Sequence, residues 1–310
     1  MDGVLIIDKP AGMTSHDVVA RVRRILGERR IGHTGTLDPF ATGVLIVLVG
    51  RATRLAQFLS GAVKEYEAGI RLGFSTDTGD LSGRRTTAAQ EKTNSLSKED
   101  VEAALASLRG EIEQIPPMYS AKKIEGKKLY ELARRGEQVE RKSVRVTIHS
   151  LELIGDVGKI FPQQVAGTSD IRVRVVCSAG TYVRTLAEDL GKRLGVGAHV
   201  VELRRTRAGD FDLKRATTLE KLEEHKQRGS LDDILITPDV AVDFLPCVLL
   251  TAAEVRRTQQ GLPLKLESKP AFGDADWVRM RDAAGALVAV GTYDPEGDLV
   301  RPRVVLSLDQ

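Results

Sequence analysis

The sequence lacks the patterns that would tie it to a structural metal, a disulfide framework or a membrane. Its two cysteines, Cys177 and Cys247, lie far apart and form neither a zinc-binding spacing nor a disulfide framework. Its histidines show no ligand spacing either. No apolar run is long enough to span a bilayer, and the N-terminal residues lack the features of a signal peptide. We therefore expect a cytoplasmic protein without a metal.

The sequence also lacks a Walker phosphate loop, an internal repeat, and a Gly-x-Gly-x-x-Gly pattern after a strand. Chemistry that depends on ATP or NAD has no support here, and we expect no cofactor. What is present is a chain of 310 residues, 42% hydrophobic and 29% charged, with a net charge of +3. This length suits one large domain with a smaller one, and the modest charge makes local basic clusters more informative.

Periodicity predicts strands and helices without strict βα alternation, which favours the α+β class. Thr14 and Asp17 have the spacing of a capping box at a helix start. Polar or irregular loops are expected at 75–93 and 155–170. The expected strands are 3–8, 44–49, 64–74, 144–153, 171–177 and 199–206, and the expected helices are 14–26, 51–59, one opened by Ser97, 127–135 and 181–194.

A boundary is expected within 226–246, a stretch punctuated by Gly229, Pro238 and Pro246. Beyond it the pattern predicts a helix at 249–261 and short strands at 277–280, 287–292 and 304–308. A unit of this size is feasible as a small β-rich module docked on the main body.

The most informative stretch is the Gly32–Gly43 loop, which places a single carboxylate, Asp38, among glycine, threonine and proline. Pro39 fixes its own φ and pushes Asp38 toward an extended conformation. Asp-Pro is also a common turn dipeptide, and composition alone favours an ordinary turn. The apolar run 44–49 follows at once and is typical of a buried strand.

The string in this loop resembles the aspartate motif of the TruB family of pseudouridine synthases. Other segments resemble that family's motifs and follow in the family's order. They are 8–15, 64–73, 76–80, 116–123, 129–134, 178–185 and 203–209. The resemblance implies a mixed, mainly antiparallel sheet with flanking helices in a catalytic domain at 1–240. It also implies an RNA-binding thumb insert at about 120–145 and a small β-rich, PUA-like domain at 246–310.

The resemblance also assigns site residues. Asp38 becomes the reacting carboxylate, Arg184 its charge partner, and Tyr66 the residue that stacks on the target base and serves in proton transfer. The substrate-binding residues implied are His33, Asp80, Tyr182 and Leu203. Without the motifs, Arg184 would be taken as a surface arginine, Tyr66 and Leu203 as core residues, and Asp80 as an exposed loop acid.

RNA affinity is expected from two basic clusters. For the cluster in the insert at about 120–145, the alternative is a solvated charged helix, which composition alone slightly favours. The predicted RNA-binding residues are Lys122, Lys123, Lys127, Lys128, Arg134 and Arg135 in the insert, and Arg204 and Arg205 beside Leu203.

The implied function is conversion of uridine to pseudouridine in the T-loop of tRNA, at position 55, with the T-arm stem-loop as partner. We expect a monomer without an obligatory protein partner. A guide-RNA-dependent enzyme acting on ribosomal RNA is the alternative within the class, and the Thr34 loop variant and the basic insert favour the stand-alone enzyme. A tRNA-folding chaperone is the alternative from another class, and both activities can coexist.

Overall fold

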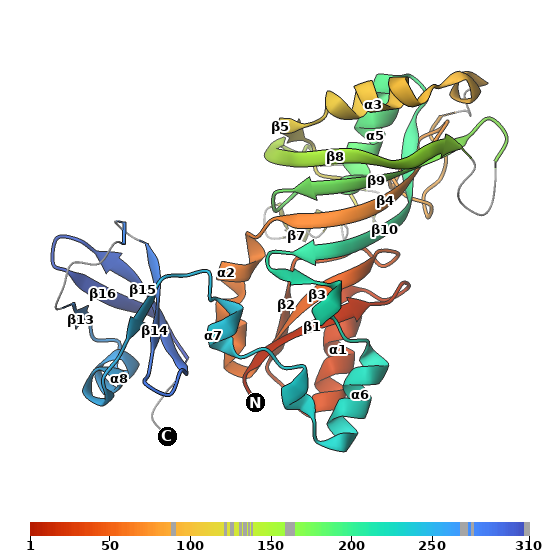
Figure 1. Ribbon diagram of the computed structural model, residues 1–310. Helices are drawn as coiled ribbons and strands as arrows, with labels where there is room; N and C mark the ends of the chain where they lie inside the picture. Colours follow the sequence, from red (N-terminus) through yellow and green to blue (C-terminus); the bar gives the residue numbers. More distant parts are fainter. Residues whose placement is uncertain are drawn as a thin grey trace.

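In the described part of the chain, the strands form a nine-stranded sheet, a five-stranded sheet and a separate two-stranded hairpin (Figure 1). Helices flank both sheets, so the expected α+β class with a mainly antiparallel sheet is confirmed. The computed structural model describes residues 1–87, 91–120, 123–124, 127–129, 132, 135, 137, 139–158, 165–266, 272–273 and 276–306.

The large sheet runs in the order β1-β3-β10-β4-β9-β8-β5, with β2 paired to β3 and β11 paired to β10. Its described strand pairs are antiparallel except β3 with β10, which are parallel over two residue pairs. The strands are β1 (Gly3–Lys9), β2 (Ile31–Thr34), β3 (Thr42–Val49), β4 (Lys64–Leu72), β5 (Gly110–Gln114), β8 (Val144–Gly158), β9 (Ser169–Cys177), β10 (Ala198–Ala208) and β11 (Phe211–Asp212).

Strand β3 is buried on both faces, which explains its uninterrupted apolar sequence. Helices α1 (Ser15–Leu26) and α6 (Leu219–Arg228) pack on one face of β1 and β3. The other face is covered by the 3₁₀ turn Gly50–Leu55, α2 (Ala56–Ser60) and α7 (Pro238–Ala241). Thr14 caps α1 with the expected Asp17 capping box, which is confirmed.

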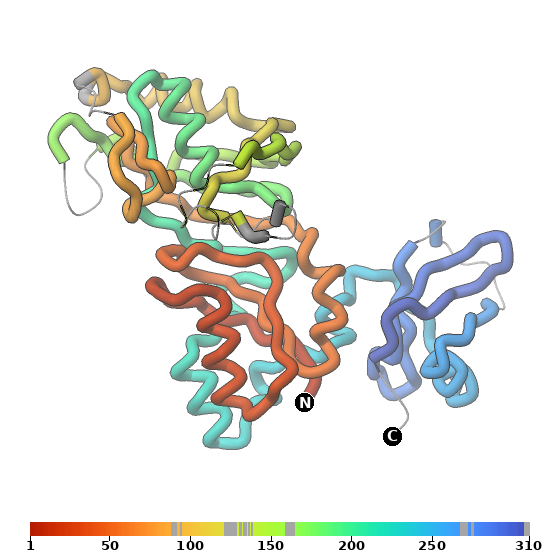
Figure 2. Tube along the Cα trace, turned by 180° about the vertical axis from the view of Figure 1, so that it is seen from behind, coloured from red at the N-terminus to blue at the C-terminus, as the bar shows by residue number. Residues whose placement is uncertain are grey.

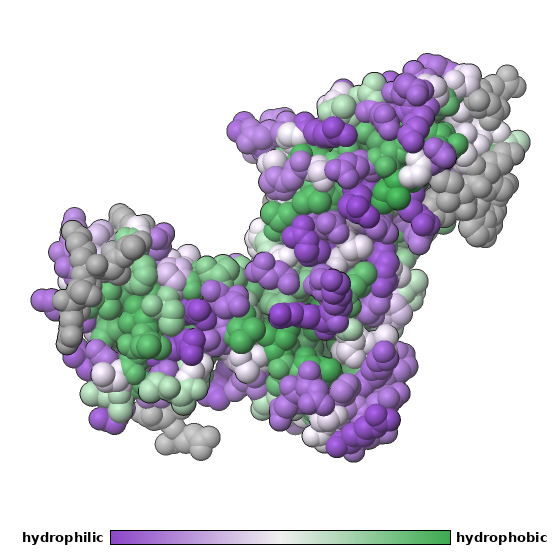
Figure 3. All heavy atoms as spheres, viewed as in Figure 1, coloured by the Kyte–Doolittle hydropathy of each residue, from purple (hydrophilic) through white to green (hydrophobic). Residues whose placement is uncertain are grey.

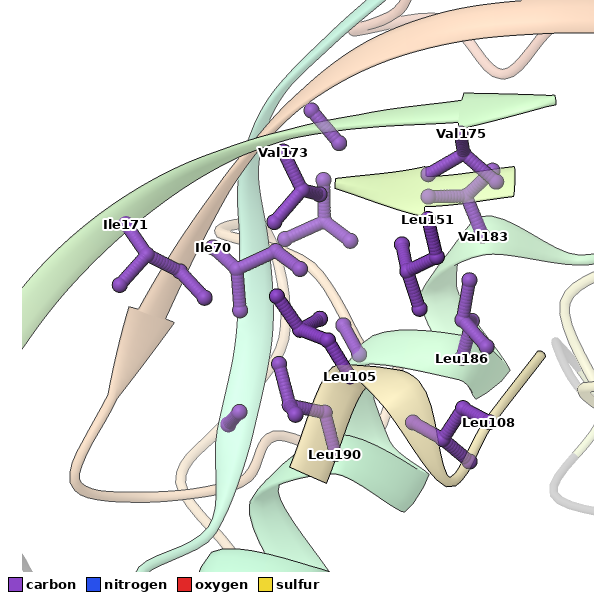
Figure 4. Close-up of a cluster of buried hydrophobic side chains, with 14 of the residues drawn as sticks. Ile70, Leu105, Leu108, Leu151, Ile171, Val173, Val175, Val183, Leu186 and Leu190 are labelled. Atoms are coloured by element: carbon purple, nitrogen blue, oxygen red, sulfur yellow. The ribbon is translucent and has the colours of Figure 1, made fainter. Parts of the chain in front are cut away.

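Helices α3 (Lys98–Ala106) and α5 (Val183–Leu194) cover one face of the other half of the sheet. Figure 4 shows Leu105 of α3 and Leu190 of α5 pointing toward Ile70 and Val173 of the strands. Alternate residues of β9 reach this cluster, as expected of a strand packed on one face, and the strand predicted at 171–177 is confirmed. Three further 3₁₀ turns are Glu91–Ser95, Leu213–Arg215 and Leu231–Asp233.

The five-stranded sheet lies beside the main body, in blue in Figures 1 and 2. It runs in the order β12-β14-β15-β16-β13 and packs with α8 (Ala252–Gln259). Phe58 meets Trp277 edge to face at 5.0 Å between ring centroids, which joins this sheet to the body. The strands are β12 (Cys247–Leu249), β13 (Leu264–Lys265), β14 (Trp277–Arg281), β15 (Leu287–Asp294) and β16 (Leu299–Val305). A division at 240–246 and a PUA-like identity for the last part stay predictions.

Three local predictions are wrong. The helix expected at 127–135 does not include Lys127 and Lys128, because they form β7 (Lys127–Lys128), which pairs with β6 (Lys123–Ile124) across the two-residue spacing of a hairpin. Strand β2 was expected as loop. Strand β8 runs on to Gly158, which pairs with Asp170, inside the expected loop 155–170.

The surface viewed in Figure 3 is hydrophilic around α6, at the lower right, and mixed over the sheets. The composition of α6 accounts for this, because only Leu219 and Leu222 of the helix are buried. No helix in the described part of the chain is long and apolar enough to cross a bilayer.

Position 43, the second residue of β3, requires glycine. Gly43 has φ +98°, and a Cβ there would lie 2.1 Å from the backbone oxygen of Arg205 on β10. We expect Gly43→Ala to lower the free energy of unfolding by about 2 kcal/mol or more, since it adds backbone strain and forces β10 away. Urea unfolding measures this.

Gly61→Ala is the matched control, because Gly61 has an ordinary negative φ and open space around its Cβ position. Equal stability losses in the two variants would contradict the close approach of β3 and β10.

Candidate active site

The Asp38 loop lies in the large sheet where β2 and β10 pair with different parts of β3. Strand β3 pairs with β2 through Ile46–Val49 and with β10 only through Thr42 and Gly43, along the same edge. The chain leaves β2 at Thr34 and re-enters the sheet at Thr42, so loop 35–41 lies between β2 and β10. This placement puts Asp38 near the middle of the sheet instead of at its rim.

Two buried polar side chains hold this loop. The Lys9 ammonium has no exposed surface and donates to the carbonyls of Pro10 (2.8 Å), Pro39 (3.2 Å) and Ala41 (2.7 Å). The Ser15 hydroxyl accepts from the Leu37 N–H at 2.9 Å. Burial lowers the pKa of Lys9 to about 8, which leaves it mostly protonated at neutral pH. Its three contacts with backbone carbonyls indicate a structural role.

Arg184 forms a two-pronged ion pair with Asp38. Its Nε lies 2.9 Å from Asp38 Oδ2, and its Nη2 donates to Asp38 Oδ1 at 3.0 Å. The Arg184 side chain is only 4% exposed, whereas that of Asp38 is 31% exposed. Arg184 also donates to the carbonyls of Thr78 (3.0 Å) and Tyr119 (2.7 Å), so its position is fixed from several sides.

Asp80 stands behind this pair. Its Oδ2 lies 3.6 Å from Arg184 Nη1, while its Oδ1 accepts from the Thr78 hydroxyl (2.8 Å) and the Ser82 N–H (2.9 Å). The alternative of an exposed loop acid does not hold, because Asp80 is buried. Asp80 therefore orients Arg184 and lies among the groups that set the charge of Asp38.

Burial and charge act in opposite directions on Asp38. Desolvation raises the pKa of the Asp38 carboxyl above its usual range, and Arg184 opposes that rise. The nearby Asp80 carboxylate adds to the rise. The ionised form of Asp38, which can act as a base or a nucleophile, therefore depends on the positive charge of Arg184.

A cavity of about 320 Å³ opens beside Asp38, within the size range of small-ligand sites. Tyr66 of β4 and Leu203 of β10, both almost fully buried, contribute to its wall together with Tyr182 and Arg184. Burial raises the pKa of the Tyr66 phenol, and the neighbouring Arg205 opposes the rise. A cavity lined by the Tyr66 ring, Leu203 and a carboxyl group suits a flat, polar-edged ring such as a nucleobase.

His33 lies on β2, paired with Val47, and does not line this cavity. Burial lowers the pKa of His33 to about 4, so the ring is neutral at neutral pH. Its Nδ1 is buried without a hydrogen-bond partner in the described part of the chain, and its ring meets that of His16 at 5.2 Å.

The second basic cluster does not form one exposed patch, and its role in RNA binding stays a prediction. Arg205 is 1% exposed and donates to the carbonyls of Val44 (2.6 Å) and Gly35 (2.8 Å), because its strand position points it under the Asp38 loop. Arg204 points to the opposite face and pairs with Asp8 at 2.8 Å. Alternation along β10 separates the neighbouring arginines.

Of the basic insert, the structure places Lys123, Lys127 and Lys128 on the β6–β7 hairpin and leaves Arg135 exposed. Lys122 and Arg134 lie outside the described residues.

Sequence reasoning missed Lys64, Ser178 and Thr181, which also line the cavity. Lys64 was detectable, since it stands two residues before Tyr66 on an alternating strand and therefore shares its face. In the described part of the chain, no three His, Cys, Asp or Glu side chains come together as metal ligands would.

Two family models match the chain. Residues 23–183 match the TruB family pseudouridylate synthase (N terminal domain), and residues 184–243 match the tRNA pseudouridylate synthase B C-terminal domain.

Curated relatives and solved structures agree with these matches. The tRNA pseudouridine synthase B of Geobacillus thermodenitrificans is 48% identical over 272 residues, covering 88% of this chain and 87% of the relative. That of Bacillus cytotoxicus is 41% identical over 311 residues, covering 100% and 99%. The archaeal box H/ACA sRNP Nop10–Cbf5 complex is similar at TM-score 0.71 and 27% identity, covering 99% and 86% of the two chains. A Cbf5–Nop10–Gar1 complex reaches TM-score 0.74 at 29% identity, covering 99% and 85%.

Because Arg184 forms an ion pair with Asp38, replacing Arg184 should change the pKa of the Asp38 carboxyl. Arg184→Gln removes the charge that lowers the pKa of Asp38, so we expect that pKa to rise further. Titration of carboxyl-labelled aspartate by NMR measures it. Arg193→Gln, at an exposed position of the same helix, is the control. An Asp38 titration identical in the two variants would contradict the role given to Arg184.

Proposed function

The chain belongs to the TruB family of pseudouridine synthases and is a tRNA pseudouridine synthase, and we propose that it isomerises the T-loop uridine at position 55, with Asp38 as the reacting carboxylate. The observation that carries the proposal is the Asp38–Arg184 pair on the wall of a cavity that also presents Tyr66 and Leu203.

The reaction needs little beyond these groups. It breaks the N1–C1′ bond of uridine, forms a C5–C1′ bond, removes the proton from C5 and leaves one on N1. Atoms are conserved, so no redox or nucleotide cofactor is consumed. A carboxylate at this place can attack C1′, add to C6 or take a proton from C2′. All three routes need Asp38 ionised, which Arg184 favours.

The target base has to leave its stack to reach Asp38. The cavity offers it the buried Tyr66 ring on one wall and Leu203 on another. Tyr66 is also assigned the proton transfer that follows C5–C1′ bond formation. We assign His33, on β2 just before the loop, to the gap that the flipped base leaves in the RNA. An uncharged ring is favourable in that gap.

The guide-RNA-dependent alternative draws on the similarity to H/ACA complexes. Higher identity to tRNA pseudouridine synthases over the whole chain favours the stand-alone enzyme. Incubating the purified protein with a bare T-arm stem-loop and mapping pseudouridine decides between them. Product formed without a guide RNA or a partner protein supports the proposal, and absence of product contradicts it.

Replacing the carboxylate separates chemistry from binding. We expect Asp38→Asn to abolish pseudouridine formation, because the amide can act neither as base nor as nucleophile, while tRNA binding changes less than about threefold. Tritium release from C5-labelled uridine measures the chemistry, and filter binding measures affinity.

Asp232→Asn, at an exposed position on a distant turn, is the matched control. Isomerisation by Asp38→Asn at the normal rate would refute the assignment. A tRNA-folding chaperone activity is expected to survive in this variant, and refolding of a misfolded tRNA tests for it.

We propose that the β6–β7 hairpin binds RNA phosphates. We expect Lys127→Ala with Lys128→Ala to weaken tRNA binding and to reduce the slope of log affinity against log salt by about one for each phosphate that the hairpin no longer neutralises. Binding at several salt concentrations measures the slope. Arg228→Ala, whose side chain is 74% exposed on α6, is the control. A slope unchanged in the hairpin variant would show that the hairpin does not bind RNA phosphates.

A further inference from the structure

The cavity wall holds two buried cations that lack an acidic partner. Lys64 is 7% exposed and Arg205 is 1% exposed, and both line the cavity beside Asp38. Neither makes an ion pair with any residue that the structure describes. Placing a charge in such a site without a counter-ion costs free energy, and a protein retains that cost where a ligand supplies the missing charge.

The groups around Lys64 offer it no negative charge. Strand β9 contributes Cys177, whose thiol pKa is raised to about 11 by burial and which is therefore neutral. Strand β10 contributes the cation Arg205, and strand β4 the neutral phenol of Tyr66. Burial lowers the pKa of Lys64 to about 8, so most of it carries its charge at neutral pH. The carboxylate of Asp38 is occupied by Arg184.

Lys64 also retains hydrogen-bonding capacity, which sets it apart from Lys9. All three donors of Lys9 are used on backbone carbonyls. Lys64 donates to the carbonyl of Ser60 at 2.7 Å, which is one bond for a group with three donors. A cation that faces a cavity with spare donors is suited to an anionic oxygen.

We propose that Lys64 binds a backbone phosphate of the RNA next to the uridine whose base enters the cavity. This inference rests on the proposed function, and it deepens that function by assigning the cavity a phosphate contact in addition to a base contact. A phosphodiester supplies one negative charge and two terminal oxygens, which match the charge and the donors that Lys64 holds. The contact restores the counter-charge that the free protein lacks.

A double-mutant cycle on protein and RNA tests the contact. T-arm stem-loops are made with a neutral methylphosphonate at one of the phosphates flanking the target uridine. Dissociation constants are measured at fixed salt for the wild type, Lys64→Met, Lys64→Arg and the control Lys226→Met, an exposed lysine of α6. We expect one methylphosphonate to weaken wild-type binding about tenfold or more, since hydrogen bonds to charged groups are strong.

In Lys64→Met, the same methylphosphonate is expected to weaken binding less than about threefold, whereas Lys64→Arg and Lys226→Met keep the full penalty. A penalty of equal size in Lys64→Met at every position overturns the proposal, even if the variant binds poorly, because Lys64 then contacts something other than phosphate. Binding is the readout, so this result is independent of whether the wild type isomerises the unmodified stem-loop.

Stability without RNA distinguishes binding from a structural role. Removing a buried, uncompensated ammonium is expected to leave the melting temperature of Lys64→Met unchanged or higher than that of the wild type. A melting temperature lowered by more than about 5 °C would show that Lys64 supports the fold, which contradicts the proposal.

Discussion

The Asp38–Arg184 ion pair is the interaction on which the site depends, because the buried guanidinium fixes the Asp38 carboxylate and opposes the effect of its desolvation. Arg184 is buried at the start of α5, and its second and third contacts are carbonyls of segments far away in the sequence, Thr78 and Tyr119. One guanidinium thus joins the Asp38 loop, the Asp80 turn and the segment after β5. Removing Arg184 takes away the cation that opposes the desolvation of Asp38, whereas removing Asp38 leaves Arg184 with Asp80 at 3.6 Å.

Positive charge dominates the surroundings of this pair. Lys9 and Arg205 hold the Asp38 loop through backbone carbonyls, and Lys64 lies further along the cavity wall. The carboxylates of Asp38 and Asp80 both face Arg184. A site with this balance favours a polyanionic substrate, although the net charge of the whole chain is only +3. The attraction is local, where the base has to be held out of its stack.

The sequence was informative where a local rule decides the structure. The Thr14 capping box and the strands at 64–74 and 171–177 depend on residues close together in the sequence, and those predictions are confirmed. Sequence composition groups Arg204 and Arg205 as one basic cluster, whereas the strand sends their side chains to opposite faces. Strand β2 was missed since its four residues hold one strongly apolar side chain, Ile31, and only pairing with β3 makes it a strand. The motif resemblance identified Arg184 as a site residue. Its contacts with Asp38, Thr78 and Tyr119 could be known only from the three-dimensional structure.

The burial of β3 links the site to the end of the chain. Val44, Ile46 and Leu48 pack in one apolar cluster with Leu287 and Leu306, residues that belong to or directly follow strands of the small sheet. The strand that ends the Asp38 loop therefore shares one apolar cluster with a segment more than two hundred residues away. Because packed apolar clusters resist rearrangement, the Asp38 loop and the small sheet are connected through the same core.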